Sequence, residues 1–362
     1  MKLTQFTKVS QLTCFILLLI LSFIASTSAG CKKETNINSK SDKSANKLSI
    51  LTLESIKSTG YLDHIIPAFE QTYNCKIAVT TCEDSNDLLE TAVNDKESRR
   101  YDLILGIDNC FFTDKTVYED FSVNTILKQQ TFNSNYLFDI KSRIISYGYG
   151  YLSVLYNENN IPEPPETFGE LQDARFLNQI VLCNPRKTGL GRATLYWTIA
   201  LFGNEGYQQM WNSIKKNMYK AKDTWQDAML ALQMQECNMA FGFTSSPAWF
   251  AEKVTDPLPI KASVMNEGSF LYLEAAAIPV KAKHKELSEA FILHMLSPEM
   301  QRYVAFDLGL FPANESTPLP ESFTSTYYNT FPVNDRLENE NPVENINNWL
   351  DFWDRLFSHT IF

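Results

Sequence analysis

The stretch LSILTLESIKSTGYLDHIIPAFEQTYNCKIAVTTCEDSNDLLETAVNDKESRRYDLIL (residues 48–105) decides the fold, because short apolar runs alternate in it with helical patterns. The apolar runs favour buried strands, and apolar residues spaced three and four apart favour amphipathic helices. In chain order we expect a strand at Leu48–Leu53, a helix at Tyr61–Tyr73, a strand at Lys76–Thr80, a helix at Asn86–Val93 and a strand at Tyr101–Leu105. Strands that alternate with helices form a parallel sheet with right-handed crossovers, so the sequence predicts an α/β fold.

Polar residues follow each of these strands. They are Glu54-Ser55, Cys82-Glu83-Asp84 and, after Ile107, Asp108-Asn109. Ligands of parallel sheets bind beyond the carboxyl ends of the strands. We therefore expect a ligand site at this edge, with Asp84 and Asp108 as candidate members.

A second α/β pattern begins after the long aromatic segment SYGYGYLSVLY (Ser146–Tyr156), which reads as a strand that leaves the first domain. The Pro-rich stretch Ile161–Thr167 punctuates the chain behind it. The elements expected beyond it are strands at Gln179–Leu182, Met239–Phe243 and Phe270–Ala277 and helices at Gly191–Phe202, Gln208–Ile214, Asp223–Gln233 and Ser246–Ala251. Since the strand at 270–277 returns to the first domain, we expect two lobes that are joined by crossing strands and enclose a cleft.

The N-terminus reads as an export signal. Lys2 and Lys8 precede a short apolar run, Phe15–Ala25, and small residues lead into Cys31. A run this short fits a signal peptide better than a spanning helix. The small residues before Cys31 indicate cleavage and lipidation there, with a plain secretory signal as the alternative. The polar run Lys32–Lys47 that follows is typical of a disordered tether.

We expect five segments along the chain: a signal peptide at 1–30, a tether at 31–47, the first part of lobe 1 at 48–150, lobe 2 at 151–270, and a return to lobe 1 with C-terminal helices at 271–362. Near the end, Asn345–Phe357 places apolar residues at i, i+3, i+4 and i+7. This pattern predicts a packing helix, with a partner surface as the lesser alternative.

Composition excludes several function classes. The chain has 32 basic and 42 acidic residues and a formal net charge of −10, without basic blocks, which argues against nucleic acid. No motif of a Ser hydrolase, a P-loop, a zinc protease or a dinucleotide-binding turn is present. After Cys31 five cysteines remain and none forms CxxC, so neither a zinc site nor a full disulfide framework is indicated. We expect no catalytic residues, metal or cofactor.

Several residues at the ends of predicted elements are candidates for binding. The segment KTGLG (Lys187–Gly191) opens a helix, so its backbone N–H groups are placed to hold an anion, although a tight turn explains the glycines equally well. Trp225 lies in the first turn of a predicted helix, behind the candidate N-cap Asp223. Phe243 ends a strand, and the turn Thr244–Trp249 (TSSPAW) leads directly into a helix. Aromatic faces hold a flat cation with about 0.5–2 kcal/mol per ring; core packing is the alternative for each ring.

Asp84 has two possible uses. It precedes a predicted helix, where Asp is an ordinary N-cap. Its carboxylate is also suited to accept hydrogen bonds from a ligand amine. Burying such an amine without an acceptor would cost about 1–3 kcal/mol.

The pair Tyr327-Tyr328 provides a metal-binding alternative. Adjacent tyrosines ligate ferric iron in some binding proteins with two lobes. No histidine or acidic partner is evident beside this pair in the sequence, so iron is the weaker interpretation.

From Leu48 to about Phe323, the chain resembles the periplasmic thiamine-binding proteins of the type II solute-binding superfamily. The matching stretches are YNCKI…CEDS…LL (73–89), DLILGIDN (102–109), YGYGYLSVLYN with its later PP (147–165), NPRKTGLG…LYW (184–197), W…FTSSPAW (225–249), NEG…L..E.AA (266–276) and FILHMLSPEMQ (291–301). The last motif is common among binding proteins. The Asp-Asn pair at 108–109 and TSSPAW are more specific together.

The resemblance implies roles for individual residues. Asp84, Trp225 and Phe243 would surround an aminopyrimidine, and Trp249 would face a thiazolium ring. Thr188 and the Gly189 amide would meet a phosphate or hydroxyethyl end. Asp108 and Ser245 lie in the two specific motifs and complete the candidate set.

Three positions depart from the family pattern. A family tyrosine is Leu53 here, a family tryptophan is Gly309, and the family tyrosine at Phe243 has lost its hydroxyl. Two rings that hold the cation are therefore missing, which bears on the affinity and on the preference between thiamine and its phosphates.

The leading hypothesis is a monomeric binding protein without catalytic activity. A lipid on Cys31 would tether it to a membrane facing the periplasm. The lobes would close on thiamine or a thiamine phosphate and deliver it to the permease and ATPase of an ABC importer. One alternative is a ferric-ion or polyamine carrier of the same fold. Another is a thiamin-degrading enzyme with a cysteine nucleophile, for which Cys82, Cys110 and Cys183 lie at predicted strand ends.

Overall fold

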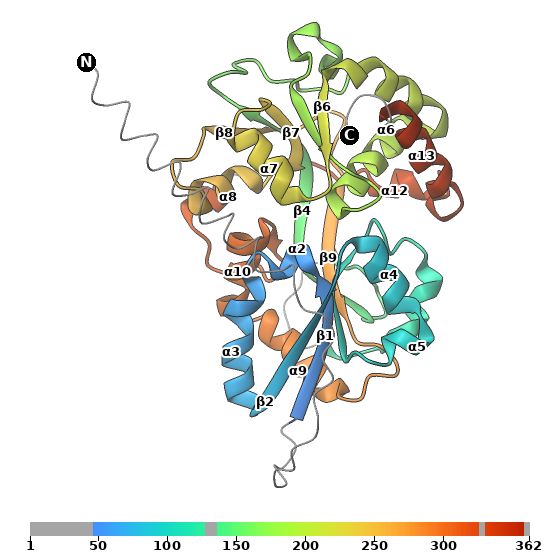
Figure 1. The fold of residues 1–362 in the computed structure, drawn as a ribbon, viewed down its shortest axis with the longest axis vertical. Helices are drawn as coiled ribbons and strands as arrows, with labels where there is room; N and C mark the ends of the chain where they lie inside the picture. The colour runs from blue at the N-terminus through green and yellow to red at the C-terminus, as the bar shows by residue number, and fades with distance from the viewer. Residues whose placement is uncertain (1–45, 127–135, 326–329, 358–362) are drawn as a thin grey trace, which may run out of the picture. The chain divides into compact units, whose positions relative to one another are not determined.

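The computed structural model describes residues 46–126, 136–325 and 330–357 (Figure 1). The predicted signal peptide, the lipidation site Cys31 and almost all of the predicted tether lie outside these residues, as does the pair Tyr327-Tyr328. Residues 45–362 form a compact unit. Within the described part of the chain, no helix combines the length and the apolar character that crossing a membrane requires.

The first part of the sheet is built from the stretch quoted at the outset. β1 (Asn46–Leu53) pairs in parallel with β2 (Cys75–Cys82) and with β3 (Leu103–Asp108), as expected. β1 begins inside the predicted tether, because residues 46 and 47 already pair with β2. β9 (Leu271–Ala277) pairs with β3 in antiparallel orientation, and it also pairs antiparallel with β4 (Ile144–Asn157).

Helices on both sides cover this part of the sheet. α3 (Tyr61–Tyr73) and α4 (Ser85–Val93) were expected within one residue of these bounds, and they lie on opposite sides of it (Figure 1). The other helices here are α2 (Glu54–Lys57), α5 (Asp95–Ser98), α9 (Lys285–Met295) and α10 (Pro298–Leu308). The burial of Ile65 and Phe69 confirms the apolar face predicted for α3, although Tyr73 at its end is 44% exposed.

The second part of the sheet continues from β4. Its strands are β7 (Met239–Phe243), β5 (Ile180–Cys183) and β6 (Met218–Lys222) in spatial order, with β8 (Ile260–Ser263) on the other side of β4. The helices that accompany it are α6 (Gly189–Ile214), α7 (Trp225–Gln233), α8 (Ser246–Lys253), α12 (Asn334–Glu338) and α13 (Pro342–Phe357). Two short elements, β10 (Phe311–Pro312) and α11 (Glu321–Thr324), complete the list, together with short stretches of 3-10 helix.

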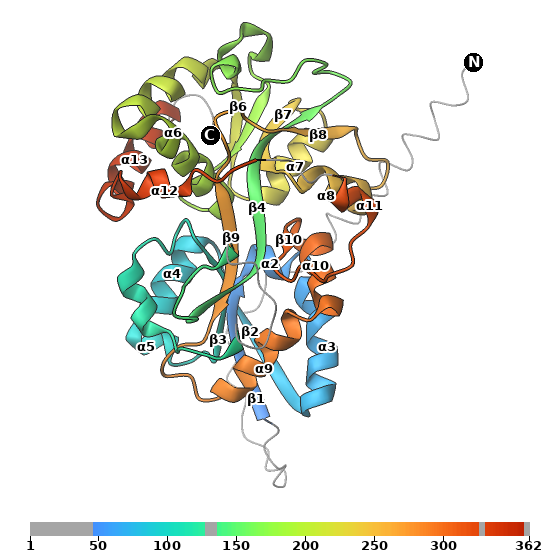
Figure 2. The same cartoon turned by 180° about the vertical axis from the view of Figure 1, so that it is seen from behind.

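β4 belongs to both parts of the sheet. Its residues Ile144–Tyr151 pair with β9, and its residues Leu152–Asn157 pair with β7 and β8. Figures 1 and 2 show β4 and β9 running from one part to the other. The predicted strand at 146–156 and the α/β class are thus confirmed, while the exact domain boundaries stay a prediction.

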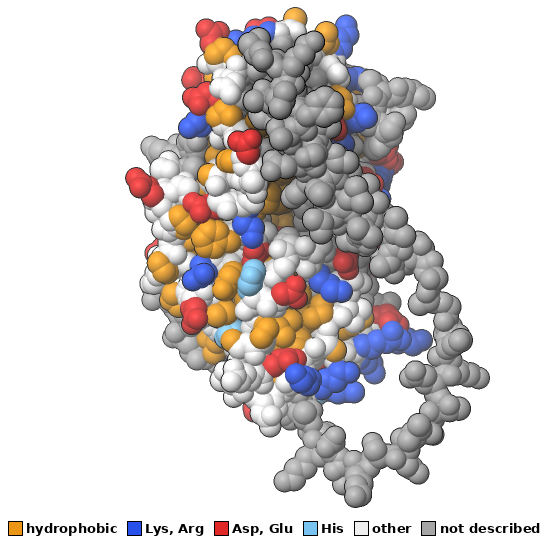
Figure 3. Space-filling model, turned by 60° about the vertical axis from the view of Figure 1, so that its left-hand side comes forward, with side chains coloured by type: hydrophobic (Ala, Val, Ile, Leu, Met, Phe, Trp, Pro, Cys, Tyr) orange, Lys and Arg blue, Asp and Glu red, His pale blue; other side chains and the backbone are white. Residues whose placement is uncertain are grey.

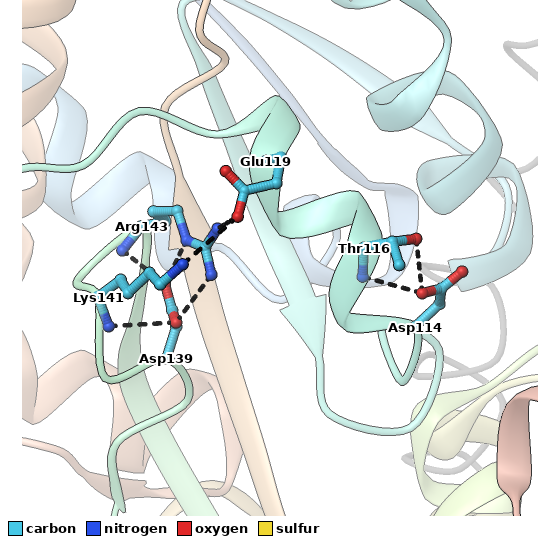
Figure 4. A network of polar contacts seen from close by, with 6 residues as sticks. All are labelled: Asp114, Thr116, Glu119, Asp139, Lys141 and Arg143. Atoms are coloured by element: carbon cyan, nitrogen blue, oxygen red, sulfur yellow. Dashed lines mark hydrogen bonds and ion pairs between the residues drawn. The ribbon is translucent and has the colours of Figure 1, made fainter.

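A polar network fixes the segment that enters β4 (Figure 4). The Nε of Arg143 donates to Asp139 at 2.8 Å, and the backbone N–H of Arg143 donates to the same carboxylate. Its Nη1 donates a hydrogen bond to Glu119, which also forms an ion pair with Lys141. Both Arg143 and Asp139 are buried, and buried charges are tolerated when they are paired and hydrogen-bonded.

Helix α6 is interrupted at Gly203, where φ is 69° and ψ is 176°. This positive φ favours glycine, and it divides α6 into the two helices that the sequence predicts on either side.

The predicted packing helix at 345–357 is confirmed as α13. Its Trp349, Trp353 and Leu356 are buried, and two of these rings contact α6: Trp349 meets Tyr196, and Trp353 meets Trp211 edge-on at 5.3 Å between ring centroids. Arg186 adds ion pairs to Asp351 and Asp354 on the same helix.

On the face shown in Figure 3, acidic and basic side chains are interspersed, apart from one group of basic side chains near its lower edge. This face does not present the continuous basic surface that is typical of nucleic-acid binding.

Candidate ligand-binding site

A cavity of ≈ 110 Å³ lies where the two parts of the sheet meet. Its wall combines the end of β1, the turn after β2, the beginnings of α6 and α7, the end of β7, two residues of β9 and the end of α10. The residues on which the argument depends are Leu53, Ser55, Asp84, Lys187, Thr188, Gly189, Asp223, Trp225, Gln226, Phe243, Tyr272 and Glu274. The carboxyl ends of strands thus form part of a cavity, as the strand order predicts.

The structure brings five of the eight candidate residues into the wall of this cavity: Asp84, Thr188, Gly189, Trp225 and Phe243. The other three, Asp108, Trp249 and Ser245, lie behind it. Two of the departures from the family pattern, Leu53 and Phe243, are wall residues. The third, Gly309, lies between the wall residues Leu308 and Leu310.

Asp84 caps α4, as one interpretation of the sequence predicts. Its Oδ1 accepts the backbone N–H groups of Asn86 and Asp87, both at 3.0 Å. Neither of these bonds uses Oδ2. Capping and ligand binding are therefore compatible at this half-buried carboxylate, and the binding role stays a prediction.

The glycines of KTGLG are explained by close approach. A Cβ on Gly191 would lie 2.6 Å from backbone atoms of Asn184 and Cys183. A Cβ on Gly189 would lie 2.6 Å from the hydroxyl of Tyr272 and 2.9 Å from Oδ2 of Asp108. Thr188 is the N-cap of α6, because its Oγ1 accepts the N–H of Gly191 at 3.0 Å. Close packing thus explains both glycines, and the predicted tight turn with a backbone that only glycine permits is wrong, because neither has a positive φ and both lie in α6. Anion binding by the same segment stays a prediction.

Trp225 is the first residue of α7, and its indole ring lines the cavity. Its Nε1 is buried without a hydrogen-bond partner among the described residues. The prediction that Asp223 is the N-cap is wrong. Thr224 caps the helix instead, because its side chain accepts the N–H of Asp227. Asp223 is instead drawn to Lys187, whose Nζ lies 2.9 Å from its carboxylate.

Trp249 and Ser245 support the cavity from behind. The Trp249 ring meets Trp225 edge-on, with 4.7 Å between ring centroids. Ser245 is buried and donates its hydroxyl to the carbonyl of Gly309 at 2.5 Å. A Cβ on Gly309 would lie 3.3 Å from the Trp225 ring, so the small residue at 309 gives the two indole rings their room.

Asp108 is buried at the end of β3. Its Oδ1 accepts the N–H groups of Cys110 and Phe111 at 2.8 Å, while Oδ2 has no hydrogen-bond partner among the described residues. Burial raises the pKa of this carboxyl to about 6, against the lowering effect of the two N–H bonds and of Arg192. Asp108 lies directly behind the wall residue Gly189, at the floor of the cavity.

Glu274 is a wall residue that sequence reasoning missed. It stands on β9 directly opposite Asp108 in the ladder with β3. The hydroxyls of Tyr147 and Tyr272 donate to its carboxylate at 2.6 Å and 3.2 Å. Burial raises its pKa to about 7. The available signal was one acidic residue in an otherwise uncharged buried strand, LYLEAAA, since Glu is rarely buried without a reason.

Two hydrogen bonds cross the cavity between the parts of the sheet. The N–H of Ser85, at the start of α4, donates to the carbonyl of Lys187 before α6 at 3.3 Å. The Nε2 of Gln226 on α7 donates to the carbonyl of Ser55 on α2 at 3.1 Å. These contacts hold the walls of the cavity together in this conformation.

The five cysteines after Cys31 are free. Burial raises the pKa of Cys183 to about 12, that of Cys110 well above its usual range, and that of Cys82 as well. A thiol is nucleophilic as thiolate, so these environments do not activate it. Among the described residues no group of histidine, cysteine and acidic side chains is arranged to hold a metal ion.

Comparison with known proteins places this geometry among binding proteins. The profile of the family described as bacterial extracellular solute-binding protein matches residues 101–354. The thiamine-binding periplasmic protein of Brucella abortus is 27% identical over 281 residues, covering 76% of this chain and 82% of that protein. The protein of the same name from Escherichia coli is 24% identical over 262 residues, covering 71% and 77%.

Solved structures give the same fold at lower identity. A periplasmic thiamin binding protein superposes with a TM-score of 0.74 at 21% identity, covering 89% of this chain and 99% of that one. A ferric binding protein from Campylobacter jejuni superposes with a TM-score of 0.69 at 18% identity, covering 85% and 99%.

Proposed function

The chain belongs to the bacterial extracellular solute-binding protein family, and from this premise we propose that it binds thiamine or a thiamine phosphate in the described cavity for delivery to an ABC importer. Its fold is the two-lobed α/β fold of type II periplasmic binding proteins, as expected. The relatives bear the names of binding proteins, which agrees with the expected absence of catalysis.

The observation that carries the proposal is the shared position of Trp225 and Asp84 in the wall of the cavity. The Trp225 ring offers an aromatic face to a flat cation. Asp84 offers a carboxylate to the exocyclic amine of an aminopyrimidine. Together they suit the flat cation and the exocyclic amine of thiamine, and the similarity to thiamine-binding relatives supports the same ligand.

The other end of the ligand would meet the start of α6. Thr188 and Gly189 line the cavity there, and the N-terminus of a long helix favours negative charge. A phosphate or a hydroxyethyl group would fit this end. A phosphate would also lie close to Lys187.

Isothermal titration calorimetry tests the proposal directly. Protein lacking residues 1–31 is titrated with thiamine, thiamine monophosphate and thiamine diphosphate at micromolar concentration. Heat of binding with at least one of them is expected. No heat with any of the three would refute the ligand assignment.

The same preparation separates the alternatives. A ferric-ion carrier would develop a visible tyrosinate charge-transfer band on addition of iron, and a polyamine carrier would lose thiamine binding in competition with spermidine. Polyamine and ferric-ion carriers share this fold. A thiamin-degrading enzyme would form products that mass spectrometry detects after incubation.

Export and tethering are a separate part of the proposal. We propose that Cys31 is lipidated and anchors a monomer to a membrane facing the periplasm, from which the ligand-loaded form docks on the permease and its ATPase. The mass of protein purified from membranes tests this, because an N-terminus at Met1 without added lipid would contradict it.

Asp84→Asn is expected to weaken thiamine binding about fivefold to tenfold, because Asn keeps an oxygen acceptor but loses the charge that strengthens the hydrogen bond. Asn caps helices as well as Asp does, so α4 and the melting temperature should change little. Calorimetry of both proteins measures the difference. Equal affinities would show that Asp84 acts as a cap only.

Gln226→Ala is expected to raise the Kd for thiamine about threefold to fivefold, since it removes one hydrogen bond between the walls of the cavity. The change should appear mainly in the dissociation rate, which stopped-flow tryptophan fluorescence measures. Gln233→Ala, at the far end of the same helix, is the matched control. A Gln226 variant with an unchanged dissociation rate would contradict a role in closure.

A further inference from the structure

One carboxylate in the wall of the cavity has no counter-charge. Glu274 is only 9% exposed, and it is one of the residues that line the cavity. Each of its two oxygens accepts one phenol hydroxyl, Oε1 from Tyr147 and Oε2 from Tyr272. Phenols stabilise a carboxylate by hydrogen bonding but bring no positive charge.

Among the described residues, no lysine, arginine or histidine pairs with Glu274. The charged group that acts on it most strongly is Asp108, which is itself acidic and stands opposite on β3. Arg192 acts on Asp108. Buried carboxylates are normally paired with a cation, because desolvation makes an isolated charge costly. When Glu274 is ionised, no cation among the described residues therefore stands beside it to balance its charge.

The other charges around the cavity do not supply the balance. Lys187, the cation in the wall, is paired with Asp223 at 2.9 Å. Asp84 adds another negative group. A positively charged group of the ligand would supply the balance that these residues do not.

We infer that Glu274 is the counter-ion of the bound ligand and the residue that makes this cavity select cations. The inference rests on the proposed function and deepens it, because the thiazolium ring of thiamine carries a permanent positive charge. Tyr147 and Tyr272 fix the carboxylate in place, so it meets the ligand without reorganisation.

If Glu274 has this role, its titration should make the affinity for the ligand depend on pH. The groups that face it are Asp108 on β3, Tyr147 on β4, Tyr272 beside it on β9 and Tyr61 on α3. Burial, opposed by the Tyr147 hydrogen bond and reinforced by Asp108, raises the pKa of Glu274 to about 7. A cation bound beside it favours the ionised form. Binding should therefore release a proton, and affinity should rise with pH across this range.

The test compares two ligands on three proteins: thiamine and a neutral isostere in which an uncharged aromatic ring replaces the thiazolium. Full-length wild-type protein is expected to prefer thiamine about tenfold, a difference of about 1.4 kcal/mol. Its affinity for thiamine is expected to rise about tenfold between pH 6 and pH 8, as the ionised fraction of Glu274 grows. Glu274→Gln should lose both the preference and the pH dependence. Glu286→Gln, which removes an exposed carboxylate on α9 away from this cavity, is the matched control and should keep both.

Each outcome decides the inference. A Glu274→Gln protein that keeps the preference for thiamine, or that weakens both ligands equally, would overturn it, because the residue would then act only on the structure. Should Glu274→Gln not fold, the wild-type protein alone decides, since equal affinity for the two ligands and a flat pH profile would also overturn it. Wild-type protein that binds neither ligand would refute the proposed function, and the inference with it.

Discussion

Trp225→Ala is expected to weaken thiamine binding about 30-fold, which corresponds to about 2 kcal/mol. Trp225 lines the cavity as the first residue of α7, and it is half-buried rather than part of the closed core. Removing the ring takes away both the cation–π contact and the apolar surface that the ligand would cover. Calorimetry gives the Kd, and a thermal melt of the same sample shows whether the fold survives.

Leu230→Ala is the matched control, because Leu230 lies on the exposed side of the same helix with 53% of its surface accessible. It should leave the affinity unchanged. A Trp225 variant that binds like the wild type would mean that the ring is a structural element. The same would follow if its melting temperature fell so far that loss of the fold explained the loss of binding.

Gly191→Ala is expected to lower the free energy of unfolding by about 3 kcal/mol, at the upper end of the usual cost of overpacking. The added Cβ would lie 2.6 Å from the backbone of Asn184 and Cys183, and backbone atoms cannot rotate away as a side chain does. The start of α6 would have to move from β5. Because Thr188 and Gly189 lie in that first turn, ligand binding should fall with stability.

Urea denaturation followed by circular dichroism measures the loss. Gly169→Ala serves as control, since a Cβ there would meet only the Thr167 hydroxyl at an ordinary 3.7 Å. We expect that variant to be neutral or slightly stabilised, because alanine restricts the unfolded chain. Equal stability of the two variants would contradict the packing explanation for KTGLG.

The fold was predictable where apolar patterns are strong. The helix at Tyr61–Tyr73 and the strand at 146–156 follow from periodicity and a long apolar run. β6 was missed because its sequence, MYKAK, has no such run. It is an edge strand that pairs only with β5, and lysine is common on such edges. β3 begins two residues later than expected, because Asp102 is used to accept the backbone N–H groups of Ser49, Lys283 and His284.

The sequence predicts those residues of the candidate site that lie at the ends of strands and helices. Asp84 and Trp225 both stand where a loop enters a helix, and both line the cavity. Asp108 also stands at an element end, but it is not a wall residue, and Gly189, which is one, lies beside its Oδ2. Glu274 lies in the middle of a strand, so position along the chain gave no sign of it. Its role depends on which strand lies beside β9, and only the tertiary structure supplies that.

Strand β4 has a consequence for how the protein denatures. Its hydrogen bonds serve β9 through residues 144–151 and serve β7 and β8 through residues 152–157, without a loop in between. Melting of either half would remove hydrogen-bond partners from β4, so we expect the two halves to unfold together and melts followed by different spectroscopic probes to coincide. Partly unfolded forms with one intact half would then be too rare to be attacked by proteases.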